Sequence, residues 1–164
     1  MLAELLHGLP PLAGPEPRVL ILGNMPSVMS LASGQYYGNP QNAFWRITAA
    51  VYRFDAADPY DRRVDALLRH DVAVWDVLRS CRRVGSLDSA IQRDSMVPND
   101  LGTFLTAHPQ IELLVFNGAA AEVNYRRLVR DAPAVATMRV PSTSPAHTMR
   151  FTDKLAQWRA ALND

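Results

Sequence analysis

The sequence of 164 residues has very few of the side chains that bind metals or form disulfides. Its single cysteine, Cys81, excludes an intrachain disulfide, a zinc site built on cysteines and a four-cysteine iron–sulfur cluster. The four histidines stand far apart and form no HExxH or HxH pattern. We therefore expect a protein that works without a metal ion and without any other cofactor.

Long apolar runs are also missing. No stretch approaches the ~18 continuous apolar residues of a membrane-spanning helix. The N-terminus, MLAELLHGLPPLAG, has no basic segment, and its apolar run is too short for a signal peptide. These absences predict a cytoplasmic protein without a membrane partner. The nucleotide-binding patterns GxGxxG and GxxxxGK[ST] are absent as well.

The chain has little net positive charge, and nearly all of its basic residues are arginine. The formal net charge is +1, so a nucleic-acid ligand cannot be inferred from overall basicity. Of the 17 basic residues only Lys154 is lysine, and the other sixteen are arginine. Arginine is the better bidentate partner for phosphate, so this bias suits a phosphate-rich ligand. A GC-rich genome produces the same bias, and both explanations stay open.

Short apolar runs alternate along the chain with segments of helical spacing. Residues 18–22 (RVLIL) carry an apolar run stopped by Gly23, as expected of a strand buried on both faces. Asn39 and Pro40 suit the N-cap and the first position of a helix. The predicted strands are residues 18–22, 72–75, 112–116 and 135–140; the predicted helices are the one opened by Asn39 and residues 59–69, 98–107, 119–130 and 152–162.

This alternation predicts an α/β fold, a three-layer α/β/α sandwich around a four-stranded, mainly parallel sheet. The length suits one domain over residues 1–164, with residues 1–17 as a leader segment, and we expect a monomer. Ligands of such folds bind beyond the carboxyl ends of the strands. That rule indicates four segments, residues 23–27, 76–80, 117–118 and 141–147.

The loop after the first predicted strand offers a close backbone approach and two aromatic rings. Gly23 lets backbone amides approach a ligand. Tyr36 and Tyr37 lie in a polar loop, where exposed ring faces can stack on a flipped-out base. Alternatively, both tyrosines fold back over the core.

The loop after the last predicted strand, VPSTSPAHT, is stiff and rich in hydroxyl groups. Two prolines stiffen it, and Ser142, Thr143 and Ser144 offer donors for phosphate oxygens. Alternatively, it is only the start of a helix, although a cap needs one such residue and this run holds several. Further candidates for phosphate are the arginines beside strand ends, Arg82, Arg83, Arg139 and Arg150, whereas Arg126 and Arg127 are expected on a solvated helix face.

Taken in order, these segments resemble the uracil-DNA glycosylase superfamily. The likeness runs from about residue 18 to the C-terminus, and two of its segments are most similar to the hypoxanthine-DNA glycosylase branch. The matching segments are GNMPS (23–27), YYGNPQNAFW (36–45) and VPSTSPAH (140–147), with WDVLRSCRRVGSLDSAI (75–91) and VPNDL (97–101) resembling the branch.

Two departures from the superfamily pattern bear on mechanism. Many members carry a catalytic Asn or Asp in the first loop, where this chain has Met25, and a His opening the second, where it has Val140. Both absences fit the hypoxanthine branch, whose resemblance implies that the functional amide is Asn42. The catalytic mechanism of the other branches therefore cannot be assigned to this chain without change.

The strand-end rule and the resemblance together predict a site in three groups. A catalytic group would hold a water, the sugar or the leaving base; a second group would bind the base and a third the DNA. The predicted groups are Asn42, Asp76 and His147; Gly23, Met25, Pro26, Ser27, Tyr37 and Asn117; and Ser142, Thr143, Ser144, Pro145 and Arg150.

Each polar residue of this set also has a structural alternative. Asn39 is expected to cap the helix in which Asn42 stands one turn in. Asp76 caps the following turn as readily as it binds a base or a water, and Asn117 suits hydrogen bonds between loops. His147 contacts a phosphate, stabilises charge on the base or is merely solvated.

The resemblance implies a glycosylase that removes a deaminated base from DNA, with hypoxanthine the first choice and uracil or xanthine next. Apart from the N-terminus, only Lys154 could form the Schiff base of a strand-nicking enzyme, so we expect an abasic site as product. Two alternatives stay open, a DNA-binding module that lost the chemistry and a hydrolase of free nucleosides.

Overall fold

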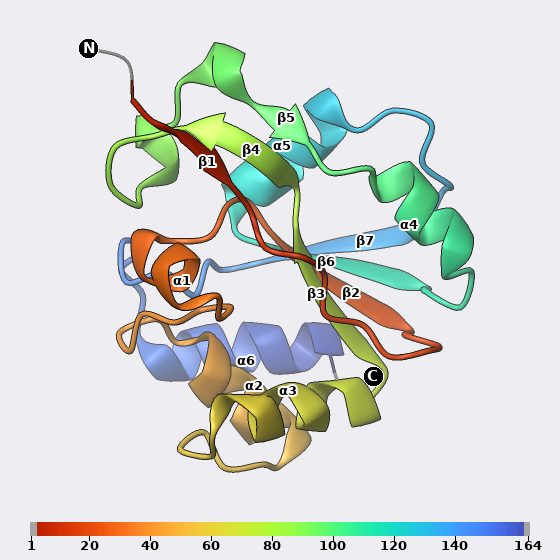
Figure 1. Cartoon of the computed structure of the whole chain (residues 1–164). Helices are drawn as coiled ribbons and strands as arrows, with labels where there is room; N and C mark the ends of the chain where they lie inside the picture. Colours follow the sequence, from red (N-terminus) through yellow and green to blue (C-terminus); the bar gives the residue numbers. More distant parts are fainter. Residues whose placement is uncertain (1–2, 163–164) are drawn as a thin grey trace.

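A four-stranded parallel sheet forms the centre of the computed structural model, which describes residues 3–162 (Figure 1). The apolar runs predicted as strands build it, and Leu20, Ile21 and Leu22 are fully buried. A strand covered on both faces needs such a continuous run. The strands stand in the order β3-β2-β6-β7, with bounds Val19–Gly23 for β2, Val72–Asp76 for β3, Leu113–Asn117 for β6 and Ala136–Val140 for β7.

Helices cover both faces of this sheet, which confirms the predicted three-layer α/β/α fold (Figure 1). On one face Phe44, Ile47 and Trp158 pack with Ile21 and Val115 of the sheet. No helix among the described residues is long and apolar enough to cross a membrane. The first layer contains α2 (Phe44–Tyr52), α3 (Tyr60–Arg69) and α6 (Phe151–Leu162), and the other side carries α1 (Val28–Ser33), α4 (Leu101–Ala107) and α5 (Ala119–Leu128).

A second, antiparallel sheet of three strands was not predicted. Its middle strand β4 (Leu78–Arg82) continues β3 beyond Val77 and pairs with β1 (Leu5–His7) and β5 (Val97–Pro98). The sequence LRSCR mixes apolar and polar residues without a turn signal, so it does not read as a separate strand. Two short 3-10 helices, η1 (Asp88–Ala90) and η2 (Arg93–Ser95), follow β4.

The segment predicted as a leader is built into the fold. Residues 5–7 form β1, and the backbone of Leu12 exchanges two hydrogen bonds with Val74, of 2.8 and 2.9 Å, along the outer edge of β3. This pairing protects an edge that would otherwise expose unpaired backbone groups. Residues 1 and 2 of the predicted leader lie outside the described part of the chain.

The prediction that Asn39 and Pro40 open a helix is wrong. Asn39 instead forms a turn, in which its Oδ1 accepts from the N–H of Gln41 and its carbonyl from that of Asn42. The helix α2 starts only at Phe44, so Asn42 precedes it instead of standing one turn inside. An Asx turn competes with a helix N-cap for the same side-chain oxygen, and here the turn is formed.

Candidate active site

A cavity of about 430 Å³ lies beyond the carboxyl ends of β2, β3 and β6. In the sheet, β2 lies between β3 and β6: the chain runs from β2 to β3 on one side and later returns to form β6 on the other. Ligands of open α/β sheets bind at such a switch point. The volume lies within the range of small-molecule sites. Its lining includes every predicted site residue except Arg150, namely Gly23, Met25, Pro26, Ser27, Tyr37, Asn42, Asp76, Asn117, Ser142, Thr143, Ser144, Pro145 and His147.

Asp76 ends β3 at the floor of the cavity and is only 4% exposed. Its neighbour across the sheet is Gly23, and a Cβ atom at that position would overlap Oδ1 of Asp76 and lie 3.0 Å from Oη of Tyr37. Only glycine therefore lets the carboxyl group and the phenol meet over the strand end. Oδ2 of Asp76 is buried and has no hydrogen-bond partner among the described residues.

Burial raises the pKa of Asp76 to about 7, and the nearby carboxylate of Asp88 adds to the rise while Arg83 opposes it. A carboxyl group with this pKa changes charge near neutrality. The alternative that Asp76 caps the next turn has no support, because its side chain accepts no hydrogen bond from the described backbone. Only its main-chain carbonyl is engaged, by Nδ2 of Asn99 at 2.8 Å.

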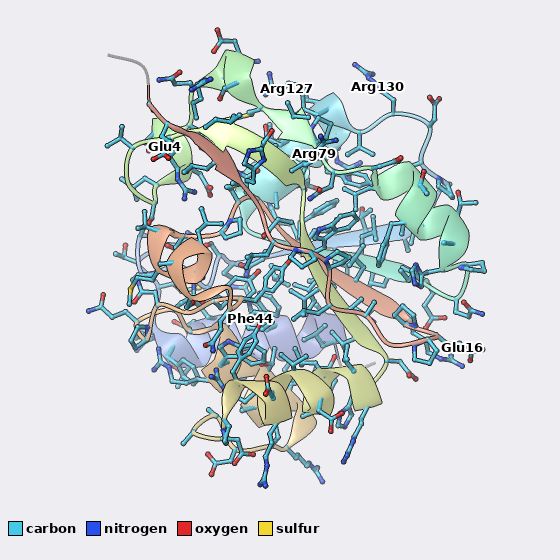
Figure 2. The ribbon with its side chains drawn as sticks, viewed as in Figure 1. Glu4, Glu16, Phe44, Arg79, Arg127 and Arg130 are labelled. Carbon is cyan, nitrogen blue, oxygen red and sulfur yellow. The ribbon has the colours of Figure 1, made fainter. Side chains whose placement is uncertain are left out.

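The two adjacent tyrosines serve different parts of the molecule. Tyr36 is 3% exposed and its Oη donates to the carbonyl of Pro10 at 2.8 Å, so it belongs to the core. Tyr37 has a left-handed backbone (φ 53°) and lines the cavity. One face of its ring stacks on Phe44, with ring centres 4.0 Å apart, and Phe44 itself lies in the interior (Figure 2). Burial and the nearby Asp76 raise the pKa of the Tyr37 phenol.

Asn117 joins the floor to the second loop. Its Nδ2 donates to Oη of Tyr37 at 3.1 Å and to Oγ1 of Thr143 at 3.0 Å, while its Oδ1 accepts from the N–H of Thr143 at 2.9 Å. Both hydrogens of the amide are therefore used within the protein. This arrangement favours the alternative in which Asn117 holds loops in place.

The second loop is anchored at its centre and open at its ends. Thr143 is 1% exposed and its Oγ1 accepts from Asn117, so the structure gives no support to the prediction that its hydroxyl binds phosphate. Its carbonyl accepts from the N–H of Ala43, which fixes the loop to the start of α2. Ser144 and His147 line the cavity, with His147 exposed, whereas Arg150 lies outside it and pairs with Asp153 at 3.2 Å.

Asn42 presents one end of its amide to the cavity. Its Oδ1 accepts from the N–H of Phe44 at 2.9 Å and so satisfies a free donor at the start of α2. Its Nδ2 has no partner among the described residues. The amide oxygen is therefore engaged within the protein, and the amide N–H groups are the part available to a ligand.

The first loop is held by its own contacts. Met25 is 8% exposed and belongs to the core cluster below the cavity, although part of it reaches the lining. Ser27 caps α1 by accepting from the N–H of Ser30 at 3.2 Å. The carbonyl of Pro26 accepts from Arg83, which is 3% exposed. The prediction that Arg83 binds phosphate is therefore wrong, because its guanidinium is buried under the loop.

Sequence reasoning missed one wall of the cavity, formed by residues 86–89, which is joined to Asn24 of the first loop. Nδ2 of Asn24 donates to Oδ1 of Asp88 at 3.0 Å, and Oδ1 of Asn24 accepts from Asn124 at 2.8 Å. Burial raises the pKa of Asp88, and the bond from Asn24 opposes the rise. No local pattern marks Asp88, because its partner Asn24 lies 64 residues away.

The remaining candidate cations are engaged elsewhere. Arg82 donates to the carbonyl of Ala3 at 2.8 Å, and Arg139 pairs with Glu122 at 3.5 Å. Arg127 and Arg130 lie at the end of the molecule beyond the small sheet (Figure 2). Within residues 3–162 no group of three or more His, Cys, Asp or Glu side chains could hold a metal ion.

Comparisons with known proteins agree on one family. The sequence profile of the Uracil DNA glycosylase superfamily matches residues 10–164. The chain is 32% identical over 155 residues to a Hypoxanthine DNA glycosylase of Methanosarcina acetivorans and 30% identical over 156 residues to one of Methanosarcina barkeri, covering 94% of this chain and 96% of each relative. The solution NMR structure of a proposed uracil DNA glycosylase from Methanosarcina acetivorans superposes with a TM-score of 0.80, at 29% identity and 97% coverage of both chains.

Proposed function

The chain belongs to the uracil-DNA glycosylase superfamily and is a DNA glycosylase, and from this we propose that it removes hypoxanthine from DNA. The reaction is hydrolysis of the N-glycosidic bond, which leaves an abasic site for base excision repair. The relatives named for hypoxanthine support this choice of base, with uracil and xanthine as the next candidates.

One observation carries the proposal: four segments far apart in the sequence line a single cavity at the switch point of the sheet. A glycosylase extrudes its target nucleotide into such a pocket because the reacting bond is inaccessible inside a duplex. Phe44 supports one face of the Tyr37 ring, and Tyr37 lines the cavity, so its ring is a candidate to stack on an extruded base.

Breaking the bond produces an oxocarbenium-like sugar and an anionic base. The protein must therefore place a water, exclude bulk solvent and stabilise negative charge on the leaving base. Nδ2 of Asn42 is a free donor for the base or the water. Asp76 in its ionised form can accept a hydrogen bond from the base or orient the water, and His147 at the rim can contact a phosphate.

We also propose that the enzyme is monofunctional. Strand nicking by a glycosylase requires an amine that forms a Schiff base with the sugar. Lys154, the single lysine, is 4% exposed and its Nζ donates to the carbonyl of Ser144 at 3.2 Å. It does not line the cavity, so it supports the second loop from behind.

Duplex oligonucleotides with one hypoxanthine, uracil or xanthine test both proposals, with the undamaged duplex as control. We expect strand breaks only after hot alkali, fastest with hypoxanthine. Tight binding without base release would favour the DNA-binding module, and release from free deoxyinosine at a comparable rate would favour the nucleoside hydrolase. A covalent adduct trapped by borohydride would contradict the monofunctional mechanism.

A further inference from the structure

A second cleft, of about 310 Å³, lies against the first cavity. The two share a wall that includes Tyr37, Asn39 and Asn42. The opposite wall of the second cleft comes from α2, α3 and residues 56–58, and it carries the guanidinium groups of Arg46 and Arg63. The second cleft is therefore adjacent to the cavity into which the target nucleotide would be extruded.

Arg63 is fixed in the cleft before any ligand arrives. Its guanidinium lies over the rings of Trp45 and Tyr60, at 4.8 and 5.6 Å from the ring centres. Its Nε donates to the carbonyl of Asp58 at 2.9 Å. The terminal nitrogens of Arg63 have no partner among the described residues, and a stacked guanidinium loses little freedom when it binds an anion.

Arg46 adds a second positive group at the same wall. It is exposed on α2, and its guanidinium lies 4.9 Å from the ring centre of Phe151. Burial lowers the pKa of Lys154, and the positive charge of Arg46 lowers it further.

These cations are not neutralised by neighbouring side chains. Within residues 3–162 neither Arg46 nor Arg63 forms an ion pair, and Asp58 is the one carboxylate among the residues that line the cleft. Two cations and one anion among the lining residues leave the cleft positive, in a protein whose formal net charge is +1.

We propose that this cleft is a phosphate site, in which Arg46 and Arg63 bind a phosphodiester of the damaged strand next to the extruded nucleotide. The inference rests on the proposed function only in taking DNA as the source of the phosphate. A free phosphate ion has the same chemistry and would occupy the same groups.

The first experiment measures the affinity for a hypoxanthine duplex over a range of sodium chloride concentrations, for Arg46→Gln and Arg63→Gln. Arg62→Gln is the matched control, because Arg62 is exposed on the same helix and lies outside the cleft. We expect each cleft variant to bind about tenfold more weakly and to lower the salt slope by roughly 1, whereas Arg62→Gln should keep the native affinity and slope. An equal loss in Arg62→Gln would overturn the proposal.

Two further variants distinguish a specific phosphate contact from misfolding and from a general change in net charge. Arg63→Lys keeps the charge without the planar stack, so it should lose less affinity than Arg63→Gln at an unchanged melting temperature. Asp58→Asn removes the opposing carboxylate and should tighten binding about threefold. Weaker binding by Asp58→Asn in a normally folded protein would contradict a phosphate at this position.

Neutral methylphosphonate linkages locate the phosphate. They are introduced one at a time on each side of the hypoxanthine, and at one position the penalty of Arg46→Gln should disappear. A penalty that persists at every position would overturn the proposal. Stronger competition by sodium phosphate than by sodium chloride of equal ionic strength would assign the cleft to free phosphate instead. Binding is read directly, so a protein that binds DNA but releases no base would refute the proposed function and leave this test valid.

Discussion

At the floor of the cavity Asp76 and Asn117 are 4% and 9% exposed, whereas at its rim Leu87 is 54% exposed. Both side chains lie at strand ends, and Asn117 is held by hydrogen bonds to Tyr37 and Thr143. His147 at the rim makes no side-chain hydrogen bond within the described residues. We therefore expect the chemistry at the floor, where burial strengthens electrostatic effects, and the positioning of DNA at the rim.

The largest expected effect at the floor is on stability. Burial raises the pKa of Asp76 from 3.8 to about 7, so between about pH 4 and pH 7 the unfolded chain releases a proton that the folded protein keeps. The free energy of unfolding should therefore fall as the pH rises through this window, by about 4 kcal/mol from this group. Urea unfolding at pH 4.5 and pH 8 measures it, and Asp76→Asn should remove that part of the pH dependence.

Asp94→Asn is the matched control for this experiment, since Asp94 is exposed and lies outside the cavity. It should retain the full pH dependence of the native protein. If Asp76→Asn also retains the full pH dependence of the free energy of unfolding, ionised Asp76 does not destabilise the fold. The floor would then not differ from the rim in this respect.

The next effect is on the rate of base release. Asp76→Asn should lower kcat by roughly 100-fold, a typical loss for a positioned proton acceptor. The accepting form is the carboxylate, so kcat of the native enzyme should rise as the pH increases through about 7, and the variant should lack this step. Single-turnover assays between pH 5.5 and pH 8.5 measure both. A native rate that falls across this range would mean that the protonated acid is the active form.

A smaller loss is expected at Asn42. Asn42→Ala should lower kcat by at least about tenfold because the free Nδ2 donor is lost, and stability by about 1 kcal/mol because the cap on Phe44 is lost. Asn42→Asp keeps an oxygen for the N–H of Phe44, so it should keep the stability but not the rate. Turnover of Asn42→Ala within about threefold of the native enzyme would show that Asn42 only caps α2.

The smallest effect should come from the rim. His147→Ala is expected to raise KM about threefold with kcat unchanged, because an exposed side chain at the mouth contributes to binding more than to chemistry. Thr148→Ala, exposed next to it and outside the cavity, should leave both constants unchanged. A tenfold fall in kcat for His147→Ala would place a catalytic group at the rim and contradict the assignment of chemistry to the floor alone.

The parts of the fold that sequence reasoning predicted are those with a strong local pattern. The run at residues 18–22 matches β2 within one residue at each end, and Pro59 does precede α3. Strand β4 was missed because three of its five residues are polar and its partners β1 and β5 are distant in the sequence. The start of α2 was misplaced because Asn39 suits an Asx turn as well as a helix cap.

The sequence predicted which residues line the cavity better than it predicted whether their side chains are buried or hydrogen-bonded. Strand ends and neighbouring loops indicated the lining, and the structure brings those segments together. Thr143 and Arg83 look like exposed donors in the sequence, yet both are buried under loops whose positions depend on contacts 26 and 57 residues away. The same limit hid Asp88 and the cleft of Arg46 and Arg63, which no motif marks.

By itself the sequence determined the parallel sheet and the strand ends that meet at the cavity. Its single cysteine and single lysine also argue against a cysteine-bound metal site and against Schiff-base chemistry. Tertiary structure alone decided that burial raises the pKa of Asp76 to about 7 and that the Asn117 amide is fully engaged. It also decided that, within residues 3–162, Oδ2 of Asp76 and Nδ2 of Asn42 have no hydrogen-bond partner. Apolar periodicity is a local property of neighbouring residues. Desolvation and hydrogen bonding depend on distances between groups that only the folded chain brings together.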